Sequence, residues 1–350
     1  MQFLHQLEPD GLVAAFAAHP PEGFTLLDAA PPVFAARFDL LTTADDALKQ
    51  RLAALPLYRY WSRWLQIRTA FVGTTVSEYA LFPRGTAPAA RVVELLQRFR
   101  PSHALMIFKD LPQASPLLCA AANQHAHALA QACVDAGCVM VEGQALAYVA
   151  IDVPDIDSYL QRLSASRRQN LRRKLRSRAA LDVRRLPTGS DCFRDPATIG
   201  AYYALYEAVF AQSEVHFDRL TRDFFATVLQ DAASGGVVFE YRQAGTLIGW
   251  NLCFEADGKL IDKYIGFRYP EARAANLYFV SWMLNLEYAI ERGLSHYVAG
   301  WTDADVKAQL GASFTATRHA VYVRNPLLRR LARHFAGHFE GEAGALKQPA

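Results

Sequence analysis

Two side chains that could exchange protons lie two residues apart in the stretch "LIDKYIGF", residues 260–267. The branched and aromatic residues of this stretch predict a β-strand. Side chains alternate between the two faces of a strand, so we expect Asp262, Tyr264 and Gly266 on one face and Lys263 on the other. If the first face lines a cleft, Asp262 can serve as a base or as an anchor for an amine, and Tyr264 as an acid. The alternative is a structural strand, in which Tyr264 lies in the core and Asp262 pairs with Lys263 at an edge.

A second chemical signal is a run of eight basic side chains without an acid, "RLSASRRQNLRRKLRSR", residues 162–178. Guanidinium groups bind phosphate through two parallel hydrogen bonds. Three interpretations are open: a solvated helix face, a basic rim that binds a phosphorylated donor or an anionic acceptor, and an arm that binds nucleic acid. The net charge of the chain is +3, so the rest of it sums to −5 (3 minus 8), and the positive charge is local. A protein that binds nucleic acid over its whole surface is therefore not indicated.

Composition sets further limits on the class of protein. Five cysteines at unrelated spacings, without a C-x-x-C pair, indicate reduced and buried thiols in a cytosolic protein. His125 and His127 are two positions apart in a predicted helix, so their rings point about 200° apart and no metal site is expected. The sequence begins without the pattern of a signal peptide, and no segment approaches the ~20 apolar residues of a membrane span. We therefore expect a cytoplasmic protein without a bound metal or a permanently bound cofactor.

Strands and helices alternate through the whole chain, which predicts an α/β (α+β) fold with a mixed sheet and flanking helices. The length of 350 residues favours two domains, and 52% hydrophobic residues supply large cores. In the first half we predict strands at 63–73, 103–112 and 139–153 and helices at 87–100 and 117–138. The second half opens with one amphipathic helix, capped by Asp155, that extends through the basic run. It continues with helices at 199–213 and 219–232, strands at 235–243, 246–255 and 259–267, a helix that ends before Gly293, a strand at 294–301, a short helix at 303–312, a strand at 315–326 and a helix at 327–339.

The order of the second-half elements resembles the GNAT acyltransferase fold: a helix pair, a three-stranded antiparallel meander, a long helix and two further strands. Local stretches resemble the FemAB-like branch of that superfamily in order and spacing: "YLQRLSASRRQNLRRKLR", "FFATVLQ", "GTLIGWNLCF" with "KLIDKYIGF", "LEYAIERGLSHYVAG" and "VKAQLGASF". This branch includes families described as peptidoglycan biosynthesis or recognition proteins. The resemblance covers residues 155–330, and 50–150 more loosely. It implies two GNAT-like lobes, a degenerate one at 1–152 and an acyltransferase lobe at 153–335, followed by a flexible tail at 336–350.

The resemblance also implies where an acyl donor binds. GNAT enzymes hold the acyl carbonyl where their fourth strand parts from the fifth, and a glycine-rich turn then binds pyrophosphate on main-chain N–H groups. The matching strand is 260–267 and the matching turn is 268–279. This turn has Asn276 and Tyr278 where the family has small residues, which weakens the expectation of coenzyme A. The residues expected to bind the donor are Gly266, Arg268, Arg273, Asn276 and Tyr278, with Arg172 and Arg173 of the basic run.

Two further residues are expected to contact the substrate. Lys307 in "DVKAQLGA" matches a lysine that recurs near the end of this branch, and it can either bind an anionic group or cap the short helix. Trp301 follows the predicted fifth strand, at the mouth of the same cleft.

Three functions are compatible with the resemblance. The first is an N-acyltransferase that uses acyl-CoA or a carrier thioester as co-substrate and acylates a small-molecule amine or a peptidoglycan precursor. The second uses aminoacyl-tRNA as the donor, and the third is a recognition protein without catalysis. The basic run and the missing glycines favour the second, whereas the modest net charge favours the first. The basic C-terminal helix can either pack on its own domain or lie on an anionic membrane.

Overall fold

The structure is a computed structural model that describes residues 3–39, 66–213 and 217–335, together with residues 51, 54, 55 and 58. The predicted tail at 336–350 and the first three residues of the predicted strand at 63–73 lie outside the described residues.

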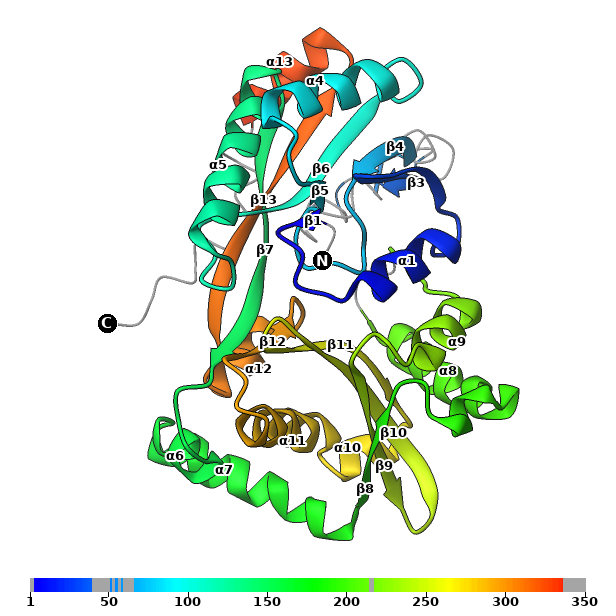
Figure 1. Ribbon diagram of the computed structural model, residues 1–350, viewed down its shortest axis with the longest axis vertical. Helices are drawn as coiled ribbons and strands as arrows, with labels where there is room; N and C mark the ends of the chain where they lie inside the picture. The colour runs from blue at the N-terminus through cyan, green and yellow to red at the C-terminus, as the bar shows by residue number, and fades with distance from the viewer. Residues whose placement is uncertain are drawn as a thin grey trace.

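An 11-stranded mixed sheet runs through the molecule (Figure 1). Its strand order is β2-β3-β4-β6-β13-β7-β12-β11-β10-β9-β8, and a separate two-stranded sheet pairs β1 with β5. The strands are β1 (Phe3–Leu4), β2 (Thr25–Ala29), β3 (Pro32–Asp39), β4 (Gln66–Val72), β5 (Phe82–Pro83), β6 (Leu105–Pro112), β7 (Val139–Ala150), β8 (Asp182–Pro187), β9 (Gly236–Gln243), β10 (Thr246–Ala256), β11 (Lys259–Phe267), β12 (His296–Gly300) and β13 (Ser313–Val323). The predicted mixed sheet with flanking helices is confirmed.

The two ends of the sheet repeat one pattern. In the N-terminal half, β2, β3 and β4 form an antiparallel meander, and β4 pairs in parallel with β6. In the C-terminal half, β9, β10 and β11 form an antiparallel meander, and β11 pairs in parallel with β12. A helix joins each parallel pair: α4 (Pro88–Phe99) precedes β6, and α11 (Leu277–Glu291) precedes β12. The first half is therefore a second copy of the GNAT-like arrangement.

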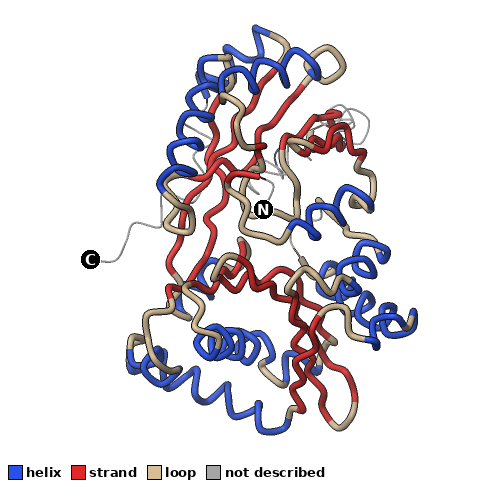
Figure 2. The backbone as a smooth tube through the Cα atoms, in the orientation of Figure 1, coloured by secondary structure: helices blue, strands red, loops and turns tan. Residues whose placement is uncertain are grey.

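Two long strands cross between the halves and make one continuous sheet. β7 comes from the first half but pairs with β12, and β13 comes from the end of the chain but pairs with β6. β7 and β13 also pair with each other, and Figure 1 shows them side by side along the long axis. Figure 2 shows the strands continuing from one half into the other. The domain boundary that we expected between residues 152 and 153 stays a prediction. The strands of each half pair with a strand from the other half, β12 with β7 and β6 with β13.

Helices cover both faces of the sheet. They are α1 (Asp10–Ala18), α5 (Ala120–Asp135), α6 (Ile156–Gln161), α7 (Ala165–Leu175), α8 (Pro196–Phe210), α9 (Arg222–Gln230), α10 (Glu271–Ala274), α12 (Ala304–Gln309) and α13 (Pro326–Phe335), with 3₁₀ turns η2 (Arg176–Ala180) and η3 (Asp191–Arg194). One core, which includes Leu260 and Tyr297, lies between the C-terminal strands and α11. The core on the other face includes Trp250 from β10 together with Phe34 and Phe71 from β3 and β4. Burial of apolar surface in this second core therefore joins the two halves.

The predicted single helix from residue 155 through the basic run is wrong in one respect. It is divided into α6 and α7, and each helix begins at its own cap. Asp155 caps α6 as predicted, with its carboxylate 2.7 Å from the Ser158 N–H. Ser164 caps α7 by accepting the Arg167 N–H at 3.4 Å. Serine hydroxyls compete for main-chain N–H groups and favour helix starts over helix interiors, which explains the interruption.

Candidate active site

A gap opens in the sheet between β11 and β12. The two strands pair at only three positions, Lys259 with His296, Leu260 with Tyr297, and Ile261 with Val298. β11 then continues to Phe267 with β10 as its neighbour, while β12 continues along β7. Among the described strands, none pairs with the β12-facing edge of β11 beyond residue 261. An unpaired strand edge presents main-chain N–H and C=O groups that a ligand can use. The predicted parting of these two strands is confirmed.

A β-bulge at the start of the gap changes which side chains share a face. Leu252 pairs with Tyr264 and Cys253 pairs with Asp262, so Lys263 is the extra residue of β11. Asp262 consequently faces α11, whereas the Tyr264 ring packs edge-on against Phe224 and Phe225 of α9. The prediction that Asp262 and Tyr264 lie on one face is therefore wrong, because the strict two-residue alternation fails at a bulge.

On the α11 face, Asp262 is the centre of a buried hydrogen-bond network. Tyr297 donates its hydroxyl to Asp262 Oδ2 at 2.8 Å, and Asn285 donates its amide to the same oxygen at 3.0 Å. Asn251 donates in turn to Asn285 Oδ1 at 3.0 Å, and both asparagines are fully buried. Burial raises the pKa of Asp262, while Tyr297 and Lys307 act in the opposite direction. Sequence reasoning missed the asparagines, although a polar amide within the apolar run of α11 was a usable signal.

Lys307 lies at the point where the strands part. Its ammonium donates to the carbonyl of Ala299 at 2.6 Å, one residue beyond the last paired position of β12. The side chain is buried, and burial lowers the pKa of Lys307 while the charges of Asp262, Asp303 and Glu78 oppose that shift. The structure therefore brings Lys307 and Asp262, two of the predicted site residues, to the same end of the gap.

The turn between β11 and α11 does not offer free main-chain N–H groups at most of its positions. The N–H groups of residues 272 to 276 all donate to carbonyls within the turn, which forms the short helix α10. The carbonyl of Ala275 accepts the hydroxyl of Ser177 from η2, so that part of the turn is also covered. Arg268 Nε lies 3.7 Å from Glu271 Oε1. The guanidinium of Arg273 donates to Gln212 Oε1 and stacks over the Tyr269 ring. Donor binding by Arg268 and Arg273 stays a prediction.

Three other predicted donor residues occupy distinct positions. Asn276 adopts a left-handed conformation with φ of 50° directly before α11. Tyr278 is largely buried, and among the described residues its hydroxyl has no hydrogen-bond partner. Burial raises the pKa of Tyr278, and the charges of Asp303 and Asp262 add to this effect. A Cβ at position 266 would lie 2.3 Å from Trp250 Nε1 and 2.9 Å from Leu205 Cβ of α8. Close packing is therefore sufficient to explain why this position is a glycine.

The basic run begins at Arg162, directly after α6, and continues along α7 and η2, on the outer side of α11 (Figure 1). Arg172 approaches Asp157 at 3.9 Å, and Arg173 donates to Asn170 on its own helix at 2.9 Å. Both arginines are exposed, and no contact that joins them to Asp262 is found among the described residues. Lys174, which sequence reasoning did not select, lies 3.3 Å from the centre of the Phe279 ring on α11.

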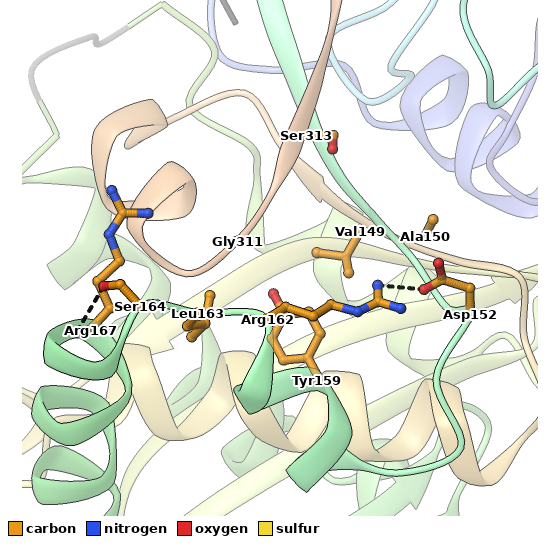
Figure 3. Close-up of a pocket in the computed structure, with 10 residues that line it drawn as sticks. All are labelled: Val149, Ala150, Asp152, Tyr159, Arg162, Leu163, Ser164, Arg167, Gly311 and Ser313. Carbon is orange, nitrogen blue, oxygen red and sulfur yellow. Dashed lines mark hydrogen bonds and ion pairs between the residues drawn. The ribbon is translucent and has the colours of Figure 1, made fainter. Parts of the chain in front are cut away.

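A cavity of about 360 Å³ opens beside the start of α7 (Figure 3). It lies where β7 ends and is bounded by the α6–α7 connection and by the segment before β13. Its charged side chains are Asp152, Arg162 and Arg167, and Arg162 pairs with Asp152 at 2.5 Å. Arg172 and Arg173, which were predicted to bind the donor, do not line this cavity, whereas Arg162 and Arg167 of the same basic run do.

Two negative findings limit the kinds of site. No helix within the described residues is long and apolar enough to cross a membrane. Among those same residues, no group of three or more His, Cys, Asp or Glu side chains is placed to hold a metal ion.

The doubled strand pattern and the gap between a parallel strand pair define a GNAT-type acyltransferase fold in two copies. Comparison with solved structures agrees with this assignment. L-PGS from Bacillus licheniformis is 9% identical over 95% of this chain and 98% of its own, with a TM-score of 0.52. The C-terminal domain (DUF2156) of a putative lysylphosphatidylglycerol synthetase from Agrobacterium fabrum is 15% identical over 77% of this chain and 81% of its own, with a TM-score of 0.50. These identities show a shared fold alone.

The family is shown by the sequence itself. Residues 103–346 match the model of the FemAB-like family, which is described as peptidoglycan biosynthesis/recognition. The chain belongs to this family, as the sequence resemblance implied. None of the curated proteins matches the chain.

Proposed function

We propose that this protein is an N-acyltransferase that moves an acyl group from a thioester of coenzyme A or of a carrier to an amine. In this reaction the amine nitrogen forms a C–N bond with the acyl carbon, and the C–S bond breaks to release the thiol. The observation that carries the proposal is the parting of β11 from β12 after three paired positions. A thioester carbonyl in this gap would meet the unpaired edge of β11, where main-chain N–H groups can stabilise the oxyanion of the tetrahedral intermediate.

The residues on the α11 face of the gap have complementary roles in this proposal. Lys307 lies at the parting point and adds a positive charge near the developing oxyanion. Tyr278, whose hydroxyl lacks a partner among the described residues, hydrogen bonds the leaving sulfur. Asp262 holds the network of Tyr297 and Asn285 beside them. These assignments keep the predicted site at β11 but use only its α11 face, opposite the face on which the Tyr264 ring packs.

A second donor, aminoacyl-tRNA, is favoured by a separate observation. The N–H groups of residues 272 to 276 donate within their own turn, so that turn lacks most of the groups that bind pyrophosphate in the coenzyme A enzymes. Arg162 and Arg167 beside the cavity could instead contact the phosphates of a nucleic acid. For the acceptor, we propose a peptidoglycan precursor with a free amine, on the basis of the family description.

The C-terminal helix supports a peripheral contact with an anionic membrane. Leu327 and Leu328 of α13 are 78% and 56% exposed, the highest values among the large hydrophobic side chains of the described residues. Arg329 and Arg330 follow them directly, and Arg329 stacks over Tyr322 of β13. Exposed leucines beside guanidinium groups suit the boundary between acyl chains and anionic head groups. We propose that this helix brings the gap close to a lipid-linked acceptor.

The test of the proposed function is a direct transfer assay. The protein is incubated with a panel of acyl-CoA thioesters or with aminoacyl-tRNA, together with amine acceptors, and amide products are identified by mass spectrometry. The proposal predicts amide formation with release of one thiol for each amide, and a large loss in the Asp262→Asn variant. Asp135→Asn, on the exposed side of α5, is the matched control and should retain full activity. Amide formed only from aminoacyl-tRNA would establish the second donor, and no amide from either donor would contradict both.

A further inference from the structure

A loop from the N-terminal half closes against the gap in the C-terminal half. This loop, residues 73–81, follows β4 and contacts the second lobe at two places. Glu78 reaches Lys263, the bulged residue of β11, and the Tyr79 ring meets Trp301 beyond the end of β12 at 6.5 Å between ring centres. The charge of Glu78 also acts on the pKa of Lys307, so Glu78 lies close to the parting point. The first half therefore supplies one wall of the candidate active site.

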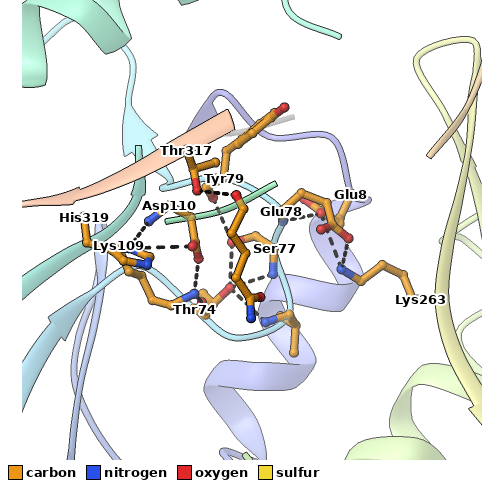
Figure 4. Close-up of polar contacts among 12 residues, drawn as sticks. Glu8, Thr74, Ser77, Glu78, Tyr79, Lys109, Asp110, Lys263, Thr317 and His319 are labelled. Carbon is orange, nitrogen blue, oxygen red and sulfur yellow. Dashed lines mark hydrogen bonds and ion pairs between the residues drawn. The ribbon is translucent and has the colours of Figure 1, made fainter. Parts of the chain in front are cut away.

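Two carboxylates converge on one ammonium in this wall (Figure 4). Lys263 Nζ lies 2.6 Å from Glu78 Oε1 and 3.6 Å from Glu8 Oε1. The side chains of Glu8, Glu78 and Lys263 are 0%, 1% and 7% exposed. If both glutamates ionise, Lys263 can neutralise only one of the two carboxylates. The remaining negative charge is buried and attracts a cation.

The two acids differ in what their oxygens contact. Glu8 Oε1 accepts the Glu78 N–H at 2.6 Å, and Glu8 Oε2 accepts the Leu7 N–H at 3.3 Å. Glu78 Oε1 is held by Lys263, but Glu78 Oε2 is buried and has no hydrogen-bond partner among the described residues. Both carboxylate oxygens of Glu8 therefore accept main-chain N–H groups, one of them from the loop, whereas Glu78 keeps one carboxylate oxygen available.

A second unpartnered group lies on the same face of β11. The hydroxyl of Tyr264 is completely buried and also lacks a hydrogen-bond partner within the described part of the chain. Tyr264 directly follows Lys263, whose ammonium contacts both Glu78 and Glu8. Burial raises the pKa of Tyr264, and the charges of Asp218, Glu78 and Glu8 add to this effect. Buried polar groups in native proteins are almost always satisfied, so an acceptor and a hydroxyl left open in one neighbourhood point to a polar ligand between them.

We propose that Glu78 and Tyr264 form the subsite for the acceptor amine, and that Glu78 is the base that takes its proton. This inference rests on the proposed function and adds the substrate class, a primary amine that arrives as an ammonium. It also changes the acid that acts with Tyr264: Asp262 lies on the opposite face of β11, whereas Asp218, Glu78 and Glu8 lie on the Tyr264 side, and of these Glu78 has a carboxylate oxygen without a partner among the described residues. The site is therefore complete only with both halves of the chain.

The proton and electron balance of the step is simple. The ammonium of the acceptor transfers one proton to Glu78 Oε2 and becomes a neutral amine. The nitrogen lone pair attacks the thioester carbonyl, and collapse of the tetrahedral intermediate breaks the C–S bond. The second proton of the nitrogen passes to the departing thiolate, and Glu78 returns its own proton to solvent. Burial favours the first transfer, because a desolvated ammonium loses its proton more readily than one in water.

Glu8 is a positioning residue in this arrangement. It accepts the Glu78 N–H, and its Oε1 lies 3.6 Å from the ammonium of Lys263 that Glu78 also contacts. Replacement of Glu8 by Gln keeps an oxygen that can accept the N–H but removes the charge. We expect Glu8→Gln to lower transfer to n-butylamine less than Glu78→Gln does, and to leave transfer to methoxyamine nearly unchanged.

The inference is tested first by binding, without any donor. In protein labelled with ¹³C at the glutamate carboxyl, addition of n-butylamine hydrochloride is expected to shift the Glu78 resonance, which the Glu78→Gln spectrum assigns. Glu94→Gln on the exposed side of α4 is the control, and its spectrum should show the same ligand-induced shift. A Glu78 resonance that does not respond to the amine overturns the inference, whatever the transfer assay gives.

The second arm uses the donor that supports transfer in the wild-type protein. Glu78→Gln should lower transfer to n-butylamine by about 100-fold or more, the usual contribution of a general base. Transfer to methoxyamine, which is already neutral at the assay pH, should be nearly unchanged in the same variant. Equal losses with both nucleophiles would show a structural role and overturn the inference. If the wild-type protein transfers to neither nucleophile, the proposed function is contradicted. The NMR binding experiment then decides by itself whether Glu78 binds an amine.

Discussion

Lys263 Nζ lies 2.6 Å from Glu78 Oε1 and so joins a strand of the C-terminal half to a loop of the N-terminal half. The contact occurs at the bulge that separates the Asp262 face of β11 from the Tyr264 face. A single residue of β11 therefore fixes both the direction of the neighbouring side chains and the position of the first lobe. This relationship explains why the gap cannot be described from the C-terminal half alone.

The pH dependence of stability should reveal the buried acids. Burial raises the pKa of Glu8 from its ordinary value of 4.5 to about 7, with the charge of Lys263 opposing the shift and that of Glu78 adding to it. The folded state then keeps a proton that the unfolded state releases between these two values. The contribution of Glu8 to stability is present below pH 4.5 and is lost as the pH rises to about 7.

The measurement for this prediction is chemical denaturation of the wild-type and Glu8→Gln proteins at several pH values. Relative to the variant, the wild-type protein should lose on the order of 3 kcal/mol across this pH range, since one pKa unit corresponds to about 1.4 kcal/mol. The comparison cancels the titration of other groups such as His5. A difference that stays constant with pH would contradict a protonated Glu8 in the folded state.

Replacement of Lys307 should separate function from stability. Lys307→Met removes the ammonium that donates to the Ala299 carbonyl, which costs about 1 kcal/mol, but it also removes a buried charge. The two effects oppose each other, so the melting temperature should change little. Acyl transfer should fall about 100-fold, as expected when a stabilising donor near an oxyanion is lost. Full activity in a folded variant would exclude Lys307 from the site.

The two glycines at 200 and 266 offer a matched pair of substitutions. A Cβ at Gly266 would lie 2.3 Å from Trp250 Nε1, so Gly266→Ala should destabilise the protein by about 1–3 kcal/mol. A Cβ at Gly200 in α8 would meet Arg222 only at 3.5 Å, and Gly200→Ala should stabilise by about 0.5–1 kcal/mol. Urea denaturation measures both. If Gly266→Ala proves neutral in stability but weakens donor binding, the predicted cofactor role of Gly266 gains support over the packing role.

Membrane contact through α13 can be measured by flotation with lipid vesicles. The wild-type protein should bind vesicles that contain phosphatidylglycerol and not vesicles of phosphatidylcholine alone, and the binding should weaken with salt. The Leu327→Glu and Leu328→Glu double variant should lose this binding. Val134→Glu, which changes another exposed apolar residue on α5, should retain it. Equal binding of the double variant would exclude α13 as the contact.

Much of the fold could be predicted because hydrophobic periodicity and turn residues act locally. The meander of β9, β10 and β11 and its Asp257–Gly258 turn follow from such signals, and both turn residues adopt positive φ angles as expected. Local signals also explain where prediction failed. The bulge at Lys263 has no mark in the alternation of side chains, and Ser164 interrupts a helix whose apolar spacing continues past it.

The candidate site was predicted only in part for a different reason. Asp262 and Lys307 could be found because both lie in stretches of the C-terminal half that resemble the family, Asp262 on β11 and Lys307 on α12. Glu8 and Glu78 could not, since the contact between Glu78 and Lys263 joins residues 185 positions apart. Charged residues in an N-terminal segment are ordinary in a sequence, and only the fold shows that they are buried together.

The central claim is that an activated acyl group lies between β11 and β12. The most direct measurement is a crystal structure of the protein with a non-hydrolysable thioester analogue of the donor. The account predicts that the acyl carbonyl lies against the open edge of β11, between residue 262 and residue 267, with its oxygen toward main-chain N–H groups. An analogue bound only in the cavity beside Arg162 and Arg167, with the edge of β11 untouched, would contradict it.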